Sequence, residues 1–126
     1  MLQLSVTKVL VADDEHAIAD TLAVILTKAG FETRAVYSGE AAVEMAGHFR
    51  PNMLITDVVM TGTSGIEAAI KIGAMLPDCK ILLFSGHAAT VDLLEKARTQ
   101  GHEFEIVAKP VHPGDLLVRL RNPIAA

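Results

Sequence analysis

Cysteine and aromatic residues are scarce in this sequence of 126 residues. Cys79 is the single cysteine, so the chain cannot form an internal disulfide, and a reducing, cytoplasmic compartment is expected. Four phenylalanines, one tyrosine and no tryptophan leave few rings on which nucleic-acid bases could stack. Together with the formal net charge of −4, this argues against direct nucleic-acid binding.

Long hydrophobic runs are also missing. No apolar run approaches the roughly 20 residues that a membrane-spanning helix needs, so no membrane contact is expected. Residues 1–5 lack the charged and apolar regions of a secretory signal. The length suits a single domain over residues 1–126, with a core over about residues 6–121, and the 51% of hydrophobic residues is ample to build it.

What the sequence does contain is a regular alternation of strand-like and helix-like segments. The expected strands cover residues 6–12, 31–36, 52–57, 80–84 and 104–108. The expected helices cover about residues 15–29, 38–48, 64–75, 89–100 and 113–121. Ser38 and Ser64 are expected N-caps, and Gly30 is expected to end the first helix. Five βα units in succession predict a doubly wound α/β sandwich.

Polar side chains follow four of the strand-like runs at the point where each run ends. They are Asp13 and Asp14, Asp57, Ser85 and Lys109. In an open parallel sheet the carboxyl ends of the strands form the ligand-binding edge, so these groups are expected to converge.

These groups suit a metal ion and a phosphoryl group. Carboxylates provide the oxygen ligands that Mg²⁺ prefers, and a bound cation would relieve their mutual repulsion. One carboxylate is then free to attack phosphorus and form an aspartyl-phosphate. Lys109 can contact the anionic group, and Ser85 can donate a hydrogen bond that exists only when the phosphoryl group is present.

Each motif alone also has a structural interpretation. The acids of residues 13–15 could cap a helix and favour its first turn, and Asp57 could form an Asx-turn. Their joint occurrence at strand ends, in order, is what those interpretations fail to explain. The five histidines predict no zinc site, since no pair has tight ligand spacing and only one cysteine is present.

Over essentially its full length the chain resembles the receiver domains of two-component response regulators. The resemblance is in Val-Ala-Asp13-Asp14-Glu15, in Ile-Thr-Asp57-Val-Val-Met with Gly62 and Gly65, and in Phe-Ser85-Gly and Val-Ala-Lys109-Pro. It implies a flavodoxin-like (βα)5 fold with a parallel five-stranded sheet in the order 2-1-3-4-5.

The resemblance also implies roles for these residues. Asp57 would accept a phosphoryl group from a sensor histidine kinase or a phosphotransfer protein. Asp14 and Asp57 would bind Mg²⁺ directly, Asp13 through water, and Val59 through its backbone carbonyl. Lys109 would contact the phosphoryl group, and Ser85 would be the switch hydroxyl. The chain would be a signalling switch and not an enzyme, with an unknown output partner or an output domain fused to it in a longer protein.

Three features depart from that family. Thr61 and Ser64 stand where many members have proline and aspartate, which changes the stiffness of the loop. Ile106 occupies the position of the usual switch aromatic, with Phe104 two residues earlier on the same expected face. The final helix is short. An apolar Val59 cannot orient water, which suggests slow dephosphorylation unless His87 positions a water instead.

Two other functions stay open at this point. A degenerate receiver would bind partners without phosphate, and Ile106 at the position of the switch aromatic is compatible with that function. A phosphohydrolase of the haloacid-dehalogenase type also uses an aspartate at a strand end. It usually needs a second aspartate two residues on, where this chain has Val59.

Overall fold

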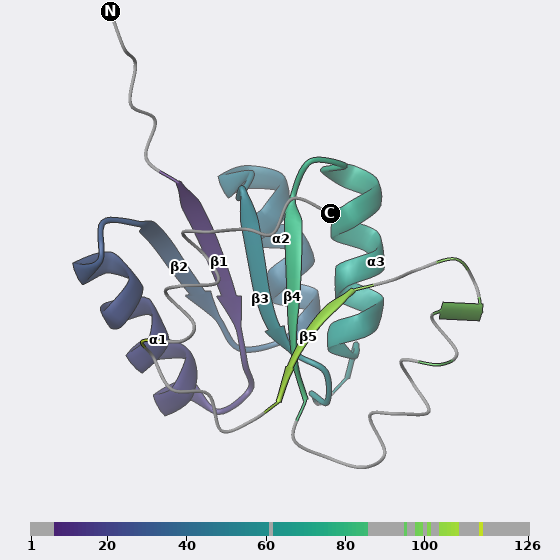
Figure 1. Cartoon of the computed structure of the whole chain (residues 1–126), viewed down its shortest axis with the longest axis horizontal. Helices are drawn as coiled ribbons and strands as arrows, with labels where there is room; N and C mark the ends of the chain where they lie inside the picture. The colour runs from purple at the N-terminus through teal and green to yellow at the C-terminus, as the bar shows by residue number, and fades with distance from the viewer. Residues whose placement is uncertain are drawn as a thin grey trace, which may run out of the picture.

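Five parallel strands form one sheet at the centre of the protein, in the order β2-β1-β3-β4-β5 (Figure 1). The computed structural model describes residues 7–60, 62–85, 95, 98, 99, 101, 104–108 and 114. The strands are β1 (Lys8–Ala12), β2 (Glu32–Val36), β3 (Met53–Asp57), β4 (Lys80–Ser85) and β5 (Glu105–Ala108). The expected parallel sheet and its strand order are confirmed.

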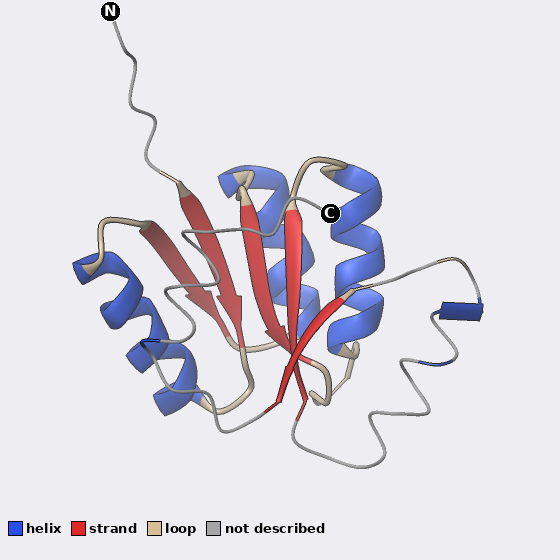
Figure 2. Cartoon of the chain, viewed as in Figure 1, coloured by secondary structure: helices blue, strands red, loops and turns tan. Residues whose placement is uncertain are grey.

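Within the described residues, three helices pack on the two faces of this sheet (Figure 2). They are α1 (His16–Lys28), α2 (Gly39–Phe49) and α3 (Gly65–Met75). Helix α1 covers one face, and α2 and α3 lie together on the other. The two further helices expected over residues 89–100 and 113–121 lie largely outside the described residues.

The helix ends follow the local chemistry of the sequence. The hydroxyls of Ser38 and Ser64 accept hydrogen bonds from Ala41 N–H and Glu67 N–H, so both expected N-caps are confirmed. After α1, Gly30 adopts a φ of 104°. The N–H of Gly30 donates to Thr27 and the N–H of Phe31 to Leu26, the hydrogen-bond pattern of a Schellman motif.

Two hydrophobic cores hold the layers together, because the strands are apolar on both faces. Under α2 and α3 lies a cluster that includes Leu10, Leu54, Ile72 and Leu83. Alternate residues of the same strands pack under α1 in the second cluster, which includes Val9, Val11, Ala19, Leu26, Ile55 and Phe84. Strand β3 is buried at all five positions, so the strand that ends in Asp57 is fixed from both sides.

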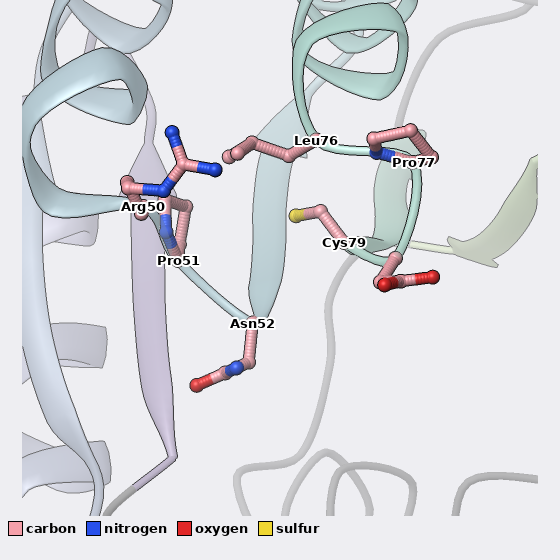
Figure 3. Close-up of a pocket in the computed structure, with 7 residues that line it drawn as sticks. Arg50, Pro51, Asn52, Leu76, Pro77 and Cys79 are labelled. Carbon is pink, nitrogen blue, oxygen red and sulfur yellow. The ribbon is translucent and has the colours of Figure 1, made fainter.

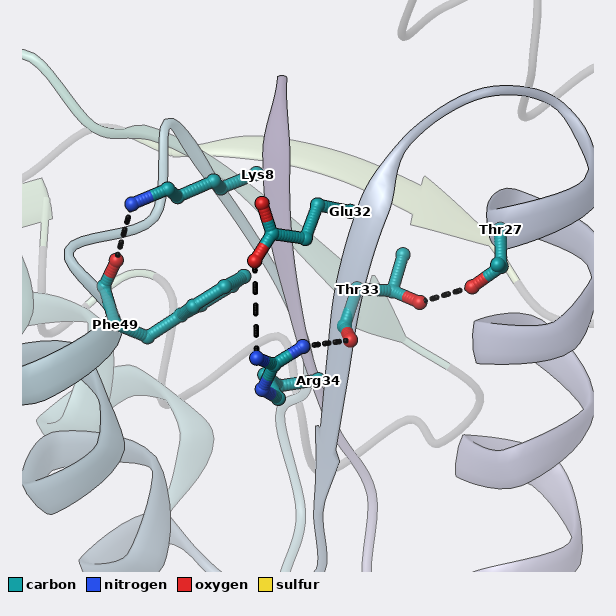
Figure 4. A network of polar contacts seen from close by, with 6 residues as sticks. All are labelled: Lys8, Thr27, Glu32, Thr33, Arg34 and Phe49. Atoms are coloured by element: carbon teal, nitrogen blue, oxygen red, sulfur yellow. Dashed lines mark hydrogen bonds and ion pairs between the residues drawn. The ribbon is translucent and has the colours of Figure 1, made fainter. Parts of the chain in front are cut away.

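Polar contacts tie the edge strand β2 and the end of α2 together at the amino ends of the strands (Figure 4). Lys8 Nζ donates to the Phe49 carbonyl at 3.2 Å, and the Arg34 guanidinium lies 4.8 Å from the Phe49 ring centre. Arg34 also pairs with Glu32 at 3.7 Å. These charged residues lie at the edge of the sheet opposite Asp57.

Candidate functional site

Three carboxylates meet at the carboxyl edge of the sheet. Asp13 and Asp14 directly follow β1, and Asp57 is the last residue of β3, the neighbouring strand. One carboxylate oxygen from each lies within 4.8 Å of the others. Asp13 is 2% exposed and Asp57 8%, whereas Asp14 is half-buried. The convergence expected from the strand ends is therefore observed for these three residues.

Backbone hydrogen bonds fix Asp13 beside the sheet. Its N–H donates to the Val36 carbonyl at the end of β2 (3.1 Å), and its Oδ1 accepts from Glu15 N–H (3.0 Å). Helix α1 begins at His16, its N-cap is Glu15 without a side-chain capping bond, and its first turn contains no acid. One of these acids, Glu15, therefore stands at the N-cap as that interpretation has it, but it makes no side-chain capping bond and no acid lies in the first turn. Asp13 instead holds the turn that leads into α1.

The connection after Asp57 is also tightly held. Val58 N–H donates to the Phe84 carbonyl of β4 at 3.0 Å. Gly65 N–H, at the start of α3, donates back to the Val58 carbonyl at 2.8 Å. A Cβ on Gly65 would overlap the Asp57 carbonyl, so α3 can begin this close to the sheet only with glycine there. These contacts fix the backbone on which the Asp57 carboxylate stands.

The donor set fits a hard divalent cation. Three carboxylates this close repel one another, and burial of two of them strengthens the repulsion because fewer waters screen it. Oxygen ligands in a partly open site are what Mg²⁺ prefers, since it retains several waters. The arrangement can therefore bind such a cation and leave a carboxylate oxygen available as a nucleophile.

The structure describes the remaining predicted site residues only in part. The register of β4 and β5 pairs Ser85 with Ala108, and β4 in turn pairs with β3, where Phe84 lies opposite Asp57. The Ser85 side chain, Lys109 and His87 lie outside the described residues. The Val59 side chain is 41% exposed beside the acids.

Phe104 and Ile106 do not behave alike, although period-2 alternation predicted one shared face. Strand β5 begins at Glu105, one residue later than expected, and Phe104 precedes it. Phe104 is partly buried against the larger core, whereas Ile106 is 42% exposed. A common face for the two residues stays a prediction. Because Phe104 lies outside the ladder, strand alternation does not fix its direction.

A polar aromatic cluster next to the site was not foreseen. The His16 and Tyr37 rings stack with centres 3.7 Å apart, and the Tyr37 hydroxyl donates to Asp20 at 2.6 Å. That hydrogen bond raises the pKa of the Tyr37 phenol. The His16 ring links α1 to the connection between β2 and α2, and a local sequence pattern gives no signal for such a contact.

A cavity of about 180 Å³ lies at the other edge of the sheet (Figure 3). Its lining includes Arg50 at the end of α2, Asn52 before β3, and Leu76 and Cys79 between α3 and β4. These residues are at the amino ends of the strands, so the cavity is separate from the carboxylates.

Several known proteins with similar sequences and folds are response regulators or receiver domains. The chain is 26% identical over 116 residues to the DNA-binding response regulator MtrA of Mycolicibacterium smegmatis, covering 90% of this chain and 49% of that protein. It is 29% identical to the response regulator receiver protein CpdR of Brucella abortus, covering 94% and 98%. The chain thus spans about half the length of MtrA-type relatives.

A solved receiver domain from Clostridium thermocellum superimposes with a TM-score of 0.81 at 27% identity, covering 93% of each chain. Within the part of the chain that the structure describes, no helix is long and apolar enough to cross a membrane. The model of the response regulator receiver domain matches residues 9–121. The chain therefore belongs to the response regulator receiver domain family, the flavodoxin-like signalling modules of two-component systems.

Proposed function

We propose that this receiver accepts a phosphoryl group on Asp57 in a Mg²⁺-dependent reaction. The donor is a phosphohistidine on a sensor histidine kinase or a phosphotransfer protein. The observation that carries the proposal is the meeting of the Asp13, Asp14 and Asp57 carboxylates at one edge of the sheet, with ligand oxygens within 4.8 Å. That arrangement supplies both a cation site and a nucleophile.

The step exchanges one bond for another. A carboxylate oxygen of Asp57 attacks phosphorus, the phosphorus–nitrogen bond breaks, and the imidazole leaves with the electron pair and takes up a proton from solvent. Bound Mg²⁺ would neutralise charge on the phosphoryl oxygens and offset the repulsion among the acids. Asp13, Asp14 and the Val59 carbonyl would hold the cation with Asp57, and Lys109 would contact the phosphoryl group.

The backbone around Asp57 supports this role, because a nucleophile must be held in place while the donor approaches. Strand β3 is buried on both faces, and Val58 and Gly65 fix the connection that follows it. The Ser85 hydroxyl, at the end of β4, would then donate a hydrogen bond to the phosphoryl group. That bond would bias an equilibrium between two conformations of the domain. Altered contacts with an output partner, or with an output domain in a longer protein, would be the consequence.

Intact-mass measurement after incubation with Mg²⁺ and acetyl phosphate tests the proposal. Wild type should gain one phosphoryl group, and Asp57→Asn should gain none. A gain on both proteins would place the acceptor elsewhere. No gain on either, from acetyl phosphate or from a phosphorylated phosphotransfer protein, would favour a binding module that works without phosphate.

A further inference from the structure

The loop that follows Asp57 is attached to the first turn of α2. Glu40, the second residue of α2, accepts a hydrogen bond through Oε2 from the backbone N–H of Thr63 at 3.2 Å. The Thr63 hydroxyl donates to the same carboxylate. One side chain of α2 therefore receives two donors from a residue 23 positions further along the chain.

Two glycines allow these segments to approach at backbone distance. A Cβ on Gly39 would overlap the Thr63 carbonyl oxygen, so the start of α2 lies directly against the loop. Gly62 has a φ of +81°, and a Cβ there would lie 2.9 Å from Glu40 Oε2. The backbone at the start of α2 thus packs directly against the loop, and the Glu40 carboxylate packs against the backbone of Gly62 and Thr63.

The charge of Glu40 suits this contact. Its own backbone N–H at the helix start, together with the two Thr63 donors and the charge of Lys71 on α3, lowers the pKa of the Glu40 carboxyl. The group is therefore ionised at neutral pH, and charge-assisted hydrogen bonds of this type are stronger than neutral ones.

The opposite end of the loop is fixed independently. Gly65 N–H donates to the Val58 carbonyl, and this bond joins the two ends of the loop independently of the Glu40 contact. We propose that Glu40 is a positioning residue that holds Gly62 and Thr63, in the loop that follows Asp57, and thereby increases the affinity of the acidic cluster for Mg²⁺.

This inference rests on the proposed function, because it assumes a cation site at Asp13, Asp14 and Asp57. Its physical basis is preorganisation: a loop already held in its bound position loses less conformational freedom when the cation binds. Outer-shell contacts of metal sites typically contribute about 10-fold to 100-fold in affinity. Glu40 acts through the loop backbone, so a smaller effect of about threefold to tenfold is expected.

Isothermal titration of the purified, cation-free protein with Mg²⁺ alone tests the role. Four proteins are compared: wild type, Glu40→Ala, Glu40→Gln and Glu44→Ala. Glutamine lacks the charge but keeps an acceptor oxygen for Thr63. Glu44 is an exposed glutamate one turn further along α2, so Glu44→Ala is a matched control for loss of a surface charge.

We expect Glu40→Ala to bind Mg²⁺ about threefold to tenfold more weakly, Glu40→Gln to lie between Glu40→Ala and wild type, and Glu44→Ala to stay within about twofold of wild type. Equal affinity of Glu40→Ala and wild type would overturn the inference and leave the proposed function standing. A loss in Glu44→Ala as large as in Glu40→Ala would also overturn it, because removal of any negative surface charge on α2 would then be responsible. Absence of Mg²⁺ binding by folded wild type would remove both proposals.

Hydrogen exchange of the Thr63 amide provides a second measurement that requires no cation. Exchange should be faster in Glu40→Ala than in wild type, because the acceptor of that N–H is lost. Exchange should be unchanged in Glu44→Ala. An unchanged Thr63 rate in folded Glu40→Ala would show that the contact does not hold the loop, and would overturn the inference.

Discussion

Gly65 lies against the backbone carbonyl of Asp57 with no room for a side chain between them. Gly65 is the first residue of α3, and its N–H closes the loop by donating to the Val58 carbonyl. Its φ is not in the left-handed region, so steric space and not backbone conformation requires glycine there. The start of α3 therefore packs directly on the backbone of the candidate phosphoacceptor, so that a shift of one would displace the other.

Substitution of Gly65 by alanine should destabilise the protein by about 3 kcal/mol, because either α3 or the end of β3 must shift. The matched control is Gly47→Ala. Gly47 is an exposed residue inside α2, and a Cβ added there would have Met75 Sδ, 3.9 Å away, as its nearest neighbour. That change should stabilise by about 0.5–1 kcal/mol, since alanine favours the helix. Urea unfolding of both variants measures the difference, and equal effects would contradict the packing argument.

Removal of one carboxylate should stabilise the cation-free protein. Asp57→Asn relieves repulsion among three acids and should raise the free energy of unfolding by about 1 kcal/mol. The increase in melting temperature that Mg²⁺ gives wild type should be lost in this variant, because a ligand stabilises only the state it binds. Thermal unfolding with and without Mg²⁺ measures both effects. Asp78→Asn, an exposed aspartate at the other edge of the sheet, should change neither.

Several features of the fold could be predicted because their causes are local in the sequence. Ser38, Ser64 and Gly30 end or begin helices through bonds to residues three or four positions away. The acidic cluster could be predicted because parallel strands place their carboxyl ends at one edge, so Asp13 and Asp57 had to become neighbours.

Contacts between distant surface residues could not be predicted in this way. Glu40 is one of several exposed glutamates, and nothing local marks it as the partner of Thr63. The stacking of His16 on Tyr37 depends on how α1 packs relative to β2. The strand β5 begins at Glu105, one residue later than expected, and a boundary of that precision could not be read from the sequence.

Arg50 provides another case where tertiary geometry overrides local preference. It ends α2 with a φ of 52° and a ψ of 63°, a left-handed conformation that suits glycine, and its N–H donates to the Ala46 carbonyl. The following Pro51 disfavours continuation of the helix at this residue. The left-handed turn allows the chain to leave α2 and enter β3 within three residues.

Replacement of Arg50 by glycine should therefore stabilise the protein by about 0.5–1 kcal/mol. The relief of left-handed strain, about 1–2 kcal/mol, exceeds the greater entropy of glycine in the unfolded chain. Arg50→Ala keeps the strain and removes only the guanidinium, so it should not stabilise. Chemical unfolding of the two variants separates backbone from side-chain effects. Stabilisation by alanine equal to that by glycine would show that the side chain, and not φ, is unfavourable.

Cys79 should react slowly with alkylating reagents in the native protein. Burial raises the pKa of its thiol from 9.0 to about 11. The thiol also donates a hydrogen bond to the Lys80 carbonyl, with Sγ 3.7 Å from the oxygen. The raised pKa means less thiolate: at pH 8 about one native molecule in a thousand is ionised, against about one in ten at the ordinary pKa.

The rate of reaction with iodoacetamide at pH 8 should consequently be about 100-fold lower in native protein than in protein unfolded by urea, since only the thiolate is nucleophilic. The native rate should rise about tenfold per pH unit from pH 8 to 10 and level off only near pH 11. A native rate that levels off near pH 9 would show that the thiol is not desolvated. The cavity beside Arg50 and Asn52 would then admit water to Cys79, and its pKa would be that of an exposed cysteine.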